Sequence, residues 1–470
     1  MVGSMNRNLL IAIVVLAIVV IGGVAYYLST QQPRKEVTIV VLSPEWEPGK
    51  ILEQLSANFT SYAQEKLGYP VKVVFDFTPW GTYYQRVTSI VTARSSEADI
   101  IFSDSQWLGE LFEGGHIIDL TDWINNDPDM KAATQDTYEN LVKFYMTYPQ
   151  GSNRYVGVPG YADAVMLLYY RKDLFNDPVE RANFKAKYGY DLPSTLEDFK
   201  RLDWLQLKDI AEFFTRRAGE TLAGQTLTED FYGITLVLSR DYDYISCSFL
   251  SMFWSWGAEL WNPSTMDPRS YINSTQGVEA LQFLHNLTRY MPPSPATYDY
   301  DKVITTFAQG KAAMTVLWPS MAPALFDPAT SRVSDKIGVA ILPQHNGVRY
   351  ITLGGQPLVI SSYSNHKEEA KLFIKWFYTV AYKDYSLRVG FTARKSIAQS
   401  SDFVNSKPWA RAFVESLPYA KDFWNIPFYG RMLEIQQKYW NMVVAGQIDP
   451  KTAMDKIAEE QWGVVQQFKK

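Results

Sequence analysis

Strand-like and helix-like segments alternate between residues 37 and 115, and this alternation constrains the fold more than any other feature of the sequence. Residues 37–42 (VTIVVL), 71–77 (VKVVFDF) and 98–102 (ADIIF) are short runs of the kind that form buried strands. The stretches between them place apolar residues at helical spacing, and the first of these stretches stops at Gly68, a typical helix end. Strands separated by helices in this order predict a parallel sheet with right-handed crossovers, and therefore an α/β fold.

A tryptophan follows each of these three strands within a few residues. The three segments are Ser43–Trp46, Thr78–Trp80 and Ser103–Trp107, and each also carries polar side chains. Ligands of open parallel sheets bind outside the carboxyl ends of the strands. Any one of the tryptophans is equally well explained as part of the core. The three together favour a binding edge.

The composition excludes several classes of protein. The chain has 470 residues, 45 basic and 50 acidic side chains, and a net charge of −5, which argues against nucleic-acid binding. The only cysteine, Cys247, cannot form an internal disulfide, and the four histidines are scattered, so we expect no metal site. No nucleotide-binding or serine-hydrolase motif is present, so we expect no cofactor. Aromatic residues make up 15% of the chain, more than a core alone needs, which favours a ligand-facing role for some of them.

Residues 9–28 (LLIAIVVLAIVVIGGVAYYL) form an uninterrupted apolar run that is long enough to cross a bilayer as one helix. We expect residues 1–35 to be a membrane anchor with a polar linker, and the body to lie on the extracellular or periplasmic side of the cell membrane. A cleavable signal peptide is the alternative, although no A-x-A cleavage pattern follows the run.

The rest of the chain continues the mixture of helices and strands. Strands are predicted over residues 165–170 and 312–317, and helices over residues 196–214, 248–260, 278–290 and 366–382 and most of 430–470. Two acidic and aromatic runs, Asp241–Tyr244 and Tyr298–Asp301, are interpreted as solvated loops.

Five fragments occur in the order seen in one family of binding proteins. They are Gly157–Leu174, Phe307–Met314 (FAQGKAAM), Lys336–Pro343, Gly354-Gly355 and Ala393–Ser396. In this order they resemble the maltose-binding-protein-like (family 1) sugar-binding proteins, which are extracellular solute-binding proteins of ABC importers. The resemblance extends from about residue 37 to the C-terminus.

The resemblance implies a two-lobed, type II periplasmic-binding-protein-like α/β fold, here preceded by one transmembrane helix. We expect lobe 1 to comprise residues 36–160 and 357–400, and lobe 2 residues 161–356 and 401–470. Gly160 and Gly355 lie at the expected crossings and are the predicted hinge positions. Such lobes close around a ligand by hinge motion.

A sugar site needs flat aromatic surfaces for the ring faces and fixed polar groups for the hydroxyls. Trp254 and Trp256 cannot share one face of a helix, so we expect Trp254 in the core and Trp256 at the cleft. Gln356 stands where relatives often carry a tryptophan. The predicted ligand-binding residues are Glu45, Trp46, Trp80, Asp104, Ser105, Gln106, Trp107, Asp163, Trp256, Trp318 and Trp424.

Three hypotheses follow for the function. The first is a monomeric receptor without catalysis that captures a saccharide and delivers it to the permease subunits of an ABC importer. The second is a membrane-bound glycoside hydrolase, which requires two carboxyl groups about 5 Å or roughly 6.5–9.5 Å apart. The third keeps the receptor fold but gives it a non-sugar ligand such as a cationic solute, held by aromatic faces and acids.

Overall fold

The computed structural model describes residues 16–17, 19–20 and 36–469. The apolar run 9–28 lies largely outside these residues, so the membrane anchor stays a prediction. Among the described residues, no helix combines the length and the apolar character that crossing a bilayer requires.

The first sheet contains the three predicted parallel strands, β1 (Val37–Pro44), β2 (Val71–Thr78) and β3 (Ile100–Phe102). β1 lies between β2 and β3 and is parallel to both, which confirms the predicted topology. The sheet continues through β11 (Ile351–Ile360), which runs antiparallel to β3 and to β4 (Val158–Val165) and parallel to β12 (Ala420–Lys421).

Helices cover both faces of this sheet because neighbouring residues of a strand point to opposite sides. Val41 packs into the core shared with Leu52 of α2, whereas Leu42 packs with Val87 of α4. The helices around this sheet are α2 (Glu47–Ser56), α3 (Phe59–Leu67), α4 (Trp80–Thr92), η1 (Ser105–Trp107), α5 (Leu108–Glu113), α6 (Thr121–Asn126), α7 (Pro128–Asp136), α8 (Glu139–Leu141), η2 (Val142–Met146), α17 (Lys367–Trp376), η6 (Phe377–Ala381) and α18 (Tyr382–Val389).

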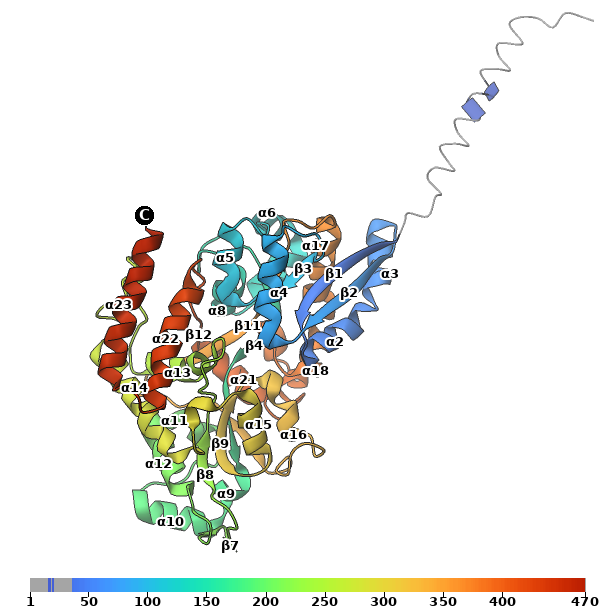
Figure 1. Cartoon of the computed structure of the whole chain (residues 1–470). Helices are drawn as coiled ribbons and strands as arrows, with labels where there is room; N and C mark the ends of the chain where they lie inside the picture. Colours follow the sequence, from blue (N-terminus) through green and yellow to red (C-terminus); the bar gives the residue numbers. More distant parts are fainter. Residues whose placement is uncertain (1–15, 18, 21–35, 470) are drawn as a thin grey trace, which may run out of the picture.

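The second sheet has the strand order β10-β5-β9-β8. Its strands are β5 (Leu167–Arg171), β8 (Tyr232–Thr235), β9 (Ala312–Leu317) and β10 (Ile337–Ala340). The chain passes from the first sheet to the second at Met166, between β4 and β5. The two sheets occupy opposite ends of the molecule, so the body is a two-lobed α/β fold, with β1–β3 in the upper part of Figure 1 and β8 and β9 in the lower part. The lobe boundaries in the sequence stay predictions.

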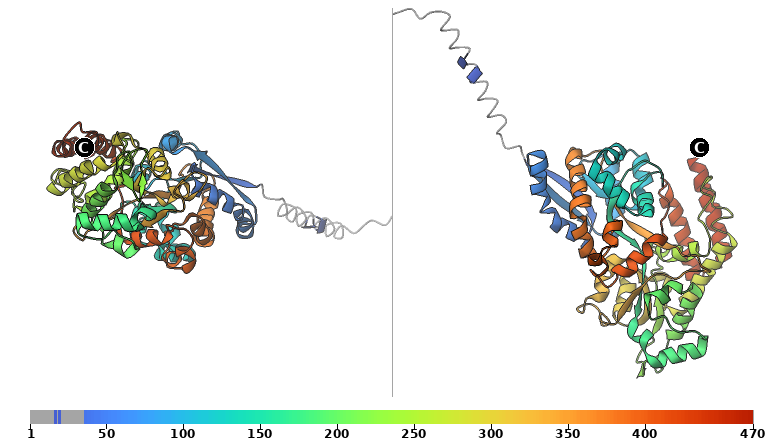
Figure 2. Two further views of the ribbon diagram at one scale, coloured as in Figure 1. Left: turned by 90° about the horizontal axis from the view of Figure 1, so that it is seen from below. Right: turned by 180° about the vertical axis from the view of Figure 1, so that it is seen from behind.

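The remaining helices surround the second sheet or lie beside both sheets. The C-terminal pair, drawn in red, packs against α13 and α14 at one side of the molecule (Figure 2). Their bounds are α9 (Lys172–Asn176), α10 (Pro178–Tyr188), α11 (Leu196–Arg201), α12 (Trp204–Phe214), α13 (Tyr244–Ser255), α14 (Thr275–Leu287), η3 (Thr288–Tyr290), η4 (Pro295–Thr297), α15 (Tyr300–Ala308), η5 (Pro319–Met321), α16 (Pro323–Phe326), α19 (Lys395–Ala398), α20 (Ser401–Val404), α21 (Ala410–Ser416), η7 (Leu417–Tyr419), α22 (Tyr429–Val444) and α23 (Pro450–Phe468), and a small hairpin is formed by β6 (Thr221–Leu222) and β7 (Gln225–Thr226).

The helix predicted over residues 196–214 is in fact two helices, α11 and α12. Leu202 between them is extended, and Asp203 begins α12 by accepting a hydrogen bond from the backbone N–H of Leu205, with Gln206 completing a capping box. An aspartate with this capping pattern favours a new helix start over continuation. Apolar residues keep the helical spacing across Leu202 and Asp203, so the spacing alone does not indicate that one helix ends and another begins there.

Candidate ligand-binding site

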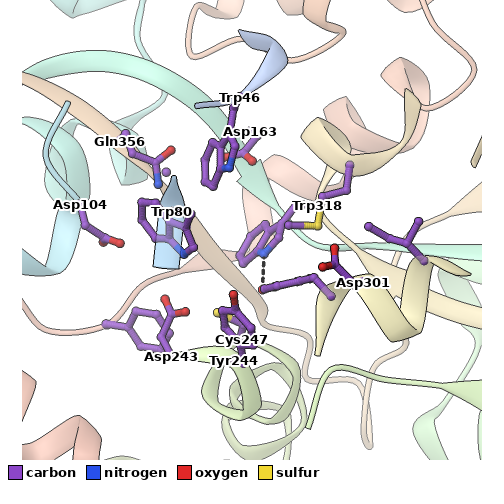
Figure 3. Close-up of a pocket in the computed structure, with 16 residues that line it drawn as sticks. Trp46, Trp80, Asp104, Asp163, Asp243, Tyr244, Cys247, Asp301, Trp318 and Gln356 are labelled. Atoms are coloured by element: carbon purple, nitrogen blue, oxygen red, sulfur yellow. Dashed lines mark hydrogen bonds between the residues drawn. The ribbon is translucent and has the colours of Figure 1, made fainter. Parts of the chain in front are cut away.

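A cavity of about 220 Å³ lies between the residues that follow β1, β2 and β3 and residues of α13, α15 and β11. Figure 3 shows Trp46, Trp80, Asp104, Asp163 and Gln356 on one side of it, with Asp243, Tyr244 and Cys247 approaching from the other. The full lining consists of Trp46, Trp80, Asp104, Asp163, Asp243, Tyr244, Cys247, Tyr300, Asp301, Ile304, Trp318, Met321, Gly354, Gly355, Gln356 and Phe423.

Two of the aromatic faces come from the ends of β1 and β2. Because these strands pair in register up to Pro44 and Thr78, the residues that follow them, Trp46 and Trp80, lie side by side with ring centroids 4.9 Å apart. Trp107 stacks on Trp80 at 6.1 Å with an angle of 15° between the ring planes. Trp107 therefore supports the ring of Trp80 from behind and does not line the cavity.

The third aromatic face, Trp318, belongs to the second sheet. It follows β9 directly, and its indole N–H donates a hydrogen bond to the hydroxyl of Tyr300 at 2.7 Å. Gly354 of β11 leaves room for this ring, since a Cβ there would lie 2.8 Å from its Cη2. Aromatic faces thus reach the cavity from both sheets.

The turn after β3 places its polar groups through local hydrogen bonds. Asp104 precedes η1, and its carboxylate accepts a hydrogen bond from the backbone N–H of Gln106 at 3.2 Å and another from the hydroxyl of Tyr242 at 3.3 Å. The side-chain amide of Gln106 donates to Asp243 at 3.2 Å. Asp104 and Asp243 are therefore linked through one glutamine although they are 139 positions apart in the chain.

Asp163 and Gln356 add two more buried polar groups. Asp163 lies in β4 and accepts a hydrogen bond from the hydroxyl of Ser320 at 2.6 Å. Gln356 is only 4% exposed, and its amide oxygen has no hydrogen-bond partner. A buried acceptor without a partner is costly, so this oxygen is suited to a donor group of a ligand.

Burial dominates the electrostatics of the cavity. Burial raises the pKa of Asp104 and that of Asp163 to about 6 each. The hydrogen bonds that each carboxylate accepts lower its pKa, but by less than burial raises it. Burial, followed by repulsion from the charge of Asp104, raises the pKa of Asp243 to about 8. The pKa of Asp422, behind the cavity, is also raised by burial. No Lys, Arg or His is among the lining residues, so no cation of the described chain offsets this set of acids.

The structure brings together five of the eleven predicted ligand-binding residues at the cavity: Trp46, Trp80, Asp104, Asp163 and Trp318. Ser105, Gln106 and Trp107 lie just behind it in η1 and are buried. Glu45 is exposed and forms an ion pair with Lys50 at 3.3 Å.

Trp256 and Trp424 lie outside the lining. Trp256 stacks on His345, with ring centroids 3.8 Å apart, and Trp424 packs against Trp261 at 5.4 Å. Trp256 is the C-cap of α13, whereas the cavity is lined by residues at the opposite, N-terminal end of this helix. Trp254 is in the core, as predicted.

The two acidic and aromatic runs are not solvated loops, and this part of the sequence interpretation was wrong. Asp243 is 8% exposed and precedes α13, whereas Tyr300 is 9% exposed and begins α15. Each run ends where a helix starts, and that helix start points at the cavity. The signal in the sequence was the aromatic residue next to each acid, because a solvated loop has no need of an aromatic side chain.

The predicted hinge glycines occupy positions where a side chain would not fit. A Cβ on Gly160 would lie 2.5 Å from the backbone oxygen of Gln356. Gly355 has a φ of 135°, and a Cβ there would lie 2.6 Å from the backbone oxygen of Tyr161. Close packing of β4 on β11 explains both glycines, and their role as hinges stays a prediction.

Residues 44–384 match the family of bacterial extracellular solute-binding proteins. The chain belongs to this family. Members are described as binding proteins and not as enzymes, which favours capture of a solute over catalysis at the cavity. Within the described residues, no group of three or more His, Cys, Asp and Glu side chains is arranged to hold a metal ion.

Solved structures of solute-binding proteins share the fold. One from Agrobacterium radiobacter K84 in complex with ribitol is 24% identical, with a TM-score of 0.71 over 92% of this chain and 100% of that chain. The maltose-bound MalE3 of T. maritima is 22% identical, with a TM-score of 0.71 over 91% of this chain and 100% of that chain. A protein from Thermotoga lettingae TMO bound with α-D-tagatose is 22% identical, with a TM-score of 0.69 over 92% of this chain and 100% of that chain.

A curated relative matches a smaller part of the sequence. It is a probable amino-acid ABC transporter periplasmic-binding protein of Sinorhizobium fredii, 26% identical over 172 residues. The alignment spans 36% of this chain and 38% of the relative.

Proposed function

We propose that this protein is the substrate-binding protein of an ABC importer, which captures a mono- or oligosaccharide between two closing lobes and delivers it to the permease. The observation that carries the proposal is the cavity itself. Trp46 and Trp80 from one sheet and Trp318 from the other surround buried carboxyl and amide groups. This combination of aromatic faces and fixed acceptors suits the apolar faces and the hydroxyl rim of a sugar.

The origin of the side chains links binding to closure. Trp46 and Trp80 follow strands of the first sheet, whereas Trp318 follows a strand of the second. A ligand can contact both sets only when the lobes are together, so it stabilises the closed form by its differential contacts. The permease can then distinguish the ligand-bound protein from the ligand-free protein by the relative position of the two lobes.

The predicted anchor over residues 9–28 fits this role. A receptor tethered beside its permease meets it at a high effective concentration without any additional contact. We propose that the body works as a monomer outside the membrane and that permease subunits of an ABC importer are its protein partners.

A calorimetric and thermal-shift screen of the purified full chain in detergent tests the proposal. We expect at least one neutral or amine-bearing saccharide or polyol to bind with measurable heat and to raise the Tm, because a ligand of the native state stabilises it. The ligand should be recovered chemically unchanged after long incubation. A flat response across mono- and oligosaccharides would contradict a sugar receptor, and release of shorter sugars would favour the glycoside hydrolase.

A further inference from the structure

The cavity has a surplus of acidic groups that a neutral ligand does not explain. Asp104, Asp163 and Asp243 are all more than nine-tenths buried, and Asp301, a solvent-exposed acid in the first turn of α15, also lines the cavity. None of these four carboxyl groups takes part in an ion pair within the described part of the chain, although many surface acids do. Buried carboxylates are normally paired with a cation, because removing a charge from water is expensive.

Asp104 and Asp243 are the centre of this surplus. Asp104 follows a strand of the first sheet and Asp243 precedes α13. Both accept a hydrogen bond from Gln106, Asp104 from its backbone N–H and Asp243 from its side-chain amide. Two carboxylates held this close repel each other, and the charge of Asp104 accordingly contributes to the raised pKa of Asp243. A hydroxyl group can donate one hydrogen bond to such a pair, but it cannot balance their charge.

The hydrogen-bonding groups of the cavity point to the same ligand chemistry. Besides the carboxylates, the buried amide oxygen of Gln356 lines the cavity and lacks a partner. The indole N–H of Trp318, a donor, is already used by Tyr300. The lining holds further neutral donors, such as the indole N–H groups of Trp46 and Trp80, but no cationic donor for its buried carboxyl groups. An ammonium group supplies three donors and no acceptor.

The aromatic faces complete the match. Trp46 and Trp80 lie side by side, and Trp318 faces the cavity from the second sheet. Tryptophan faces attract cations as well as the apolar faces of sugar rings. One set of side chains can thus hold a ring or a polyol chain and a positive charge at the same time.

We propose that the ligand of this cavity is a sugar or polyol that carries an amine, with its ammonium group placed between Asp104 and Asp243. The proposal rests on the proposed function, because it takes the cavity to be the saccharide site. It narrows the class of ligand from neutral saccharides to amino sugars and amino polyols.

Matched ligands test the proposal by calorimetry on the full chain at pH 7. Glucosamine is compared with glucose and N-acetylglucosamine, and N-methylglucamine with sorbitol, so that within each set the positive charge is the main difference. Choline serves as a cation without a sugar. We expect an amine-bearing member to bind at least tenfold more tightly than its neutral counterparts, since hydrogen bonds to charged groups are the stronger kind.

Two variants locate the effect. Asp243→Asn keeps the shape of the side chain but cannot ionise beside a bound ammonium group, so we expect it to reduce the amine-to-neutral ratio of affinities at least fivefold. Asp104→Asn should act in the same way and serves as the second variant if Asp243→Asn does not fold. Asp335→Asn removes an exposed acid that is not part of the cavity, and it should leave the ratio unchanged.

The outcomes separate this inference from the proposed function. Neutral sugars that bind as tightly as the amines would overturn the inference and leave the sugar receptor intact. Binding of choline without any sugar or polyol would overturn the sugar receptor. An amine preference that survives both Asp→Asn variants would overturn the placement of the ammonium group, and binding of neither class would contradict both proposals.

Discussion

Asp104, Asp163 and Asp243 make the site sensitive to pH because each is buried without a cation. The pKa of Asp104 and of Asp163 is about 6 and that of Asp243 is about 8, whereas an exposed aspartate has a pKa of about 3.9. The folded state therefore holds protons that the unfolded chain has already released between roughly pH 4 and pH 8. Stability is lost as the pH rises through this window. Asp243, which has the highest pKa of the three, contributes most to this loss.

We expect the Tm of the ligand-free protein to fall between pH 5 and pH 8 and the fall to be smaller in Asp243→Asn, measured by differential scanning calorimetry. Burial lowers the pKa of His116, and its contribution has the opposite sign. Asp136→Asn is the control, because burial of Asp136 is outweighed by hydrogen bonds from Ser396 and Arg394, which lower its pKa, so that its charge does not change above pH 5. That variant should lower the Tm without changing its slope with pH. A Tm that is level or rises in the wild-type protein would contradict the expected sign.

Trp80 is the aromatic residue with the clearest expected effect on binding. It lines the cavity, contacts Trp46 and is supported by Trp107. We expect Trp80→Ala to weaken binding of the ligand found in the screen roughly 10- to 100-fold, which corresponds to loss of about 1.5–3 kcal/mol of apolar contact. Trp462→Ala on α23 is the matched control and should bind normally. Equal affinities in calorimetry would remove Trp80 from the site.

At the scale of elements, the ends of β1, β2 and β3 could be predicted, whereas the starts of α13 and α15, which line the cavity, could not. Periodicity locates β1 and β2, and register then brings Trp46 and Trp80 together. Trp107 also comes a few residues after a strand, but it lies in the single helical turn η1, and its ring stacks on Trp80 outside the cavity. Asp243 enters the cavity only because α13 packs against β11, a contact between distant segments that no local pattern records.

The second element-scale feature is the close approach of β11 to Trp318. A Cβ on Gly354 would lie 2.8 Å from the indole ring, nearer than real Cβ contacts allow, and Trp318 is only 7% exposed. We expect Gly354→Ala to displace this ring, to weaken ligand binding about tenfold and to lower stability by roughly 1–3 kcal/mol, as overpacking does. Calorimetry and denaturant titration measure the two effects.

Gly463→Ala is the control for this prediction. Gly463 lies in α23 with no heavy atom within 4 Å of a built Cβ, so alanine should stabilise the helix by roughly 0.5–1 kcal/mol and leave binding unchanged. Unaltered binding in Gly354→Ala would show that Trp318 can move without consequence for the ligand.

At the scale of the whole molecule, the segments at the two sides of the cavity are joined by few polar contacts. Ser320 donates to Asp163 at 2.6 Å, Gln106 donates to Asp243 at 3.2 Å, and the indole N–H of Trp107 donates to the hydroxyl of Tyr242 at 2.5 Å. Each such bond contributes about 1 kcal/mol. In the proposed hinge motion, a small set of bonds of this size leaves the balance between open and closed forms within reach of a ligand.

Tyr242 tests this balance, because its hydroxyl accepts from Trp107 and donates to Asp104 at 3.3 Å. Tyr242→Phe leaves the indole N–H without a partner in the closed form, so we expect roughly 1–3 kcal/mol in favour of the open form. Small-angle X-ray scattering should then show a larger radius of gyration without ligand, and saturating ligand should restore the wild-type value. The apparent affinity should fall in proportion to the closed fraction. Tyr62→Phe on α3, whose ring lies away from the cavity lining, is the control. A Tyr242→Phe protein with the wild-type radius and weaker binding would place the effect in direct ligand contact, and not in closure of the lobes.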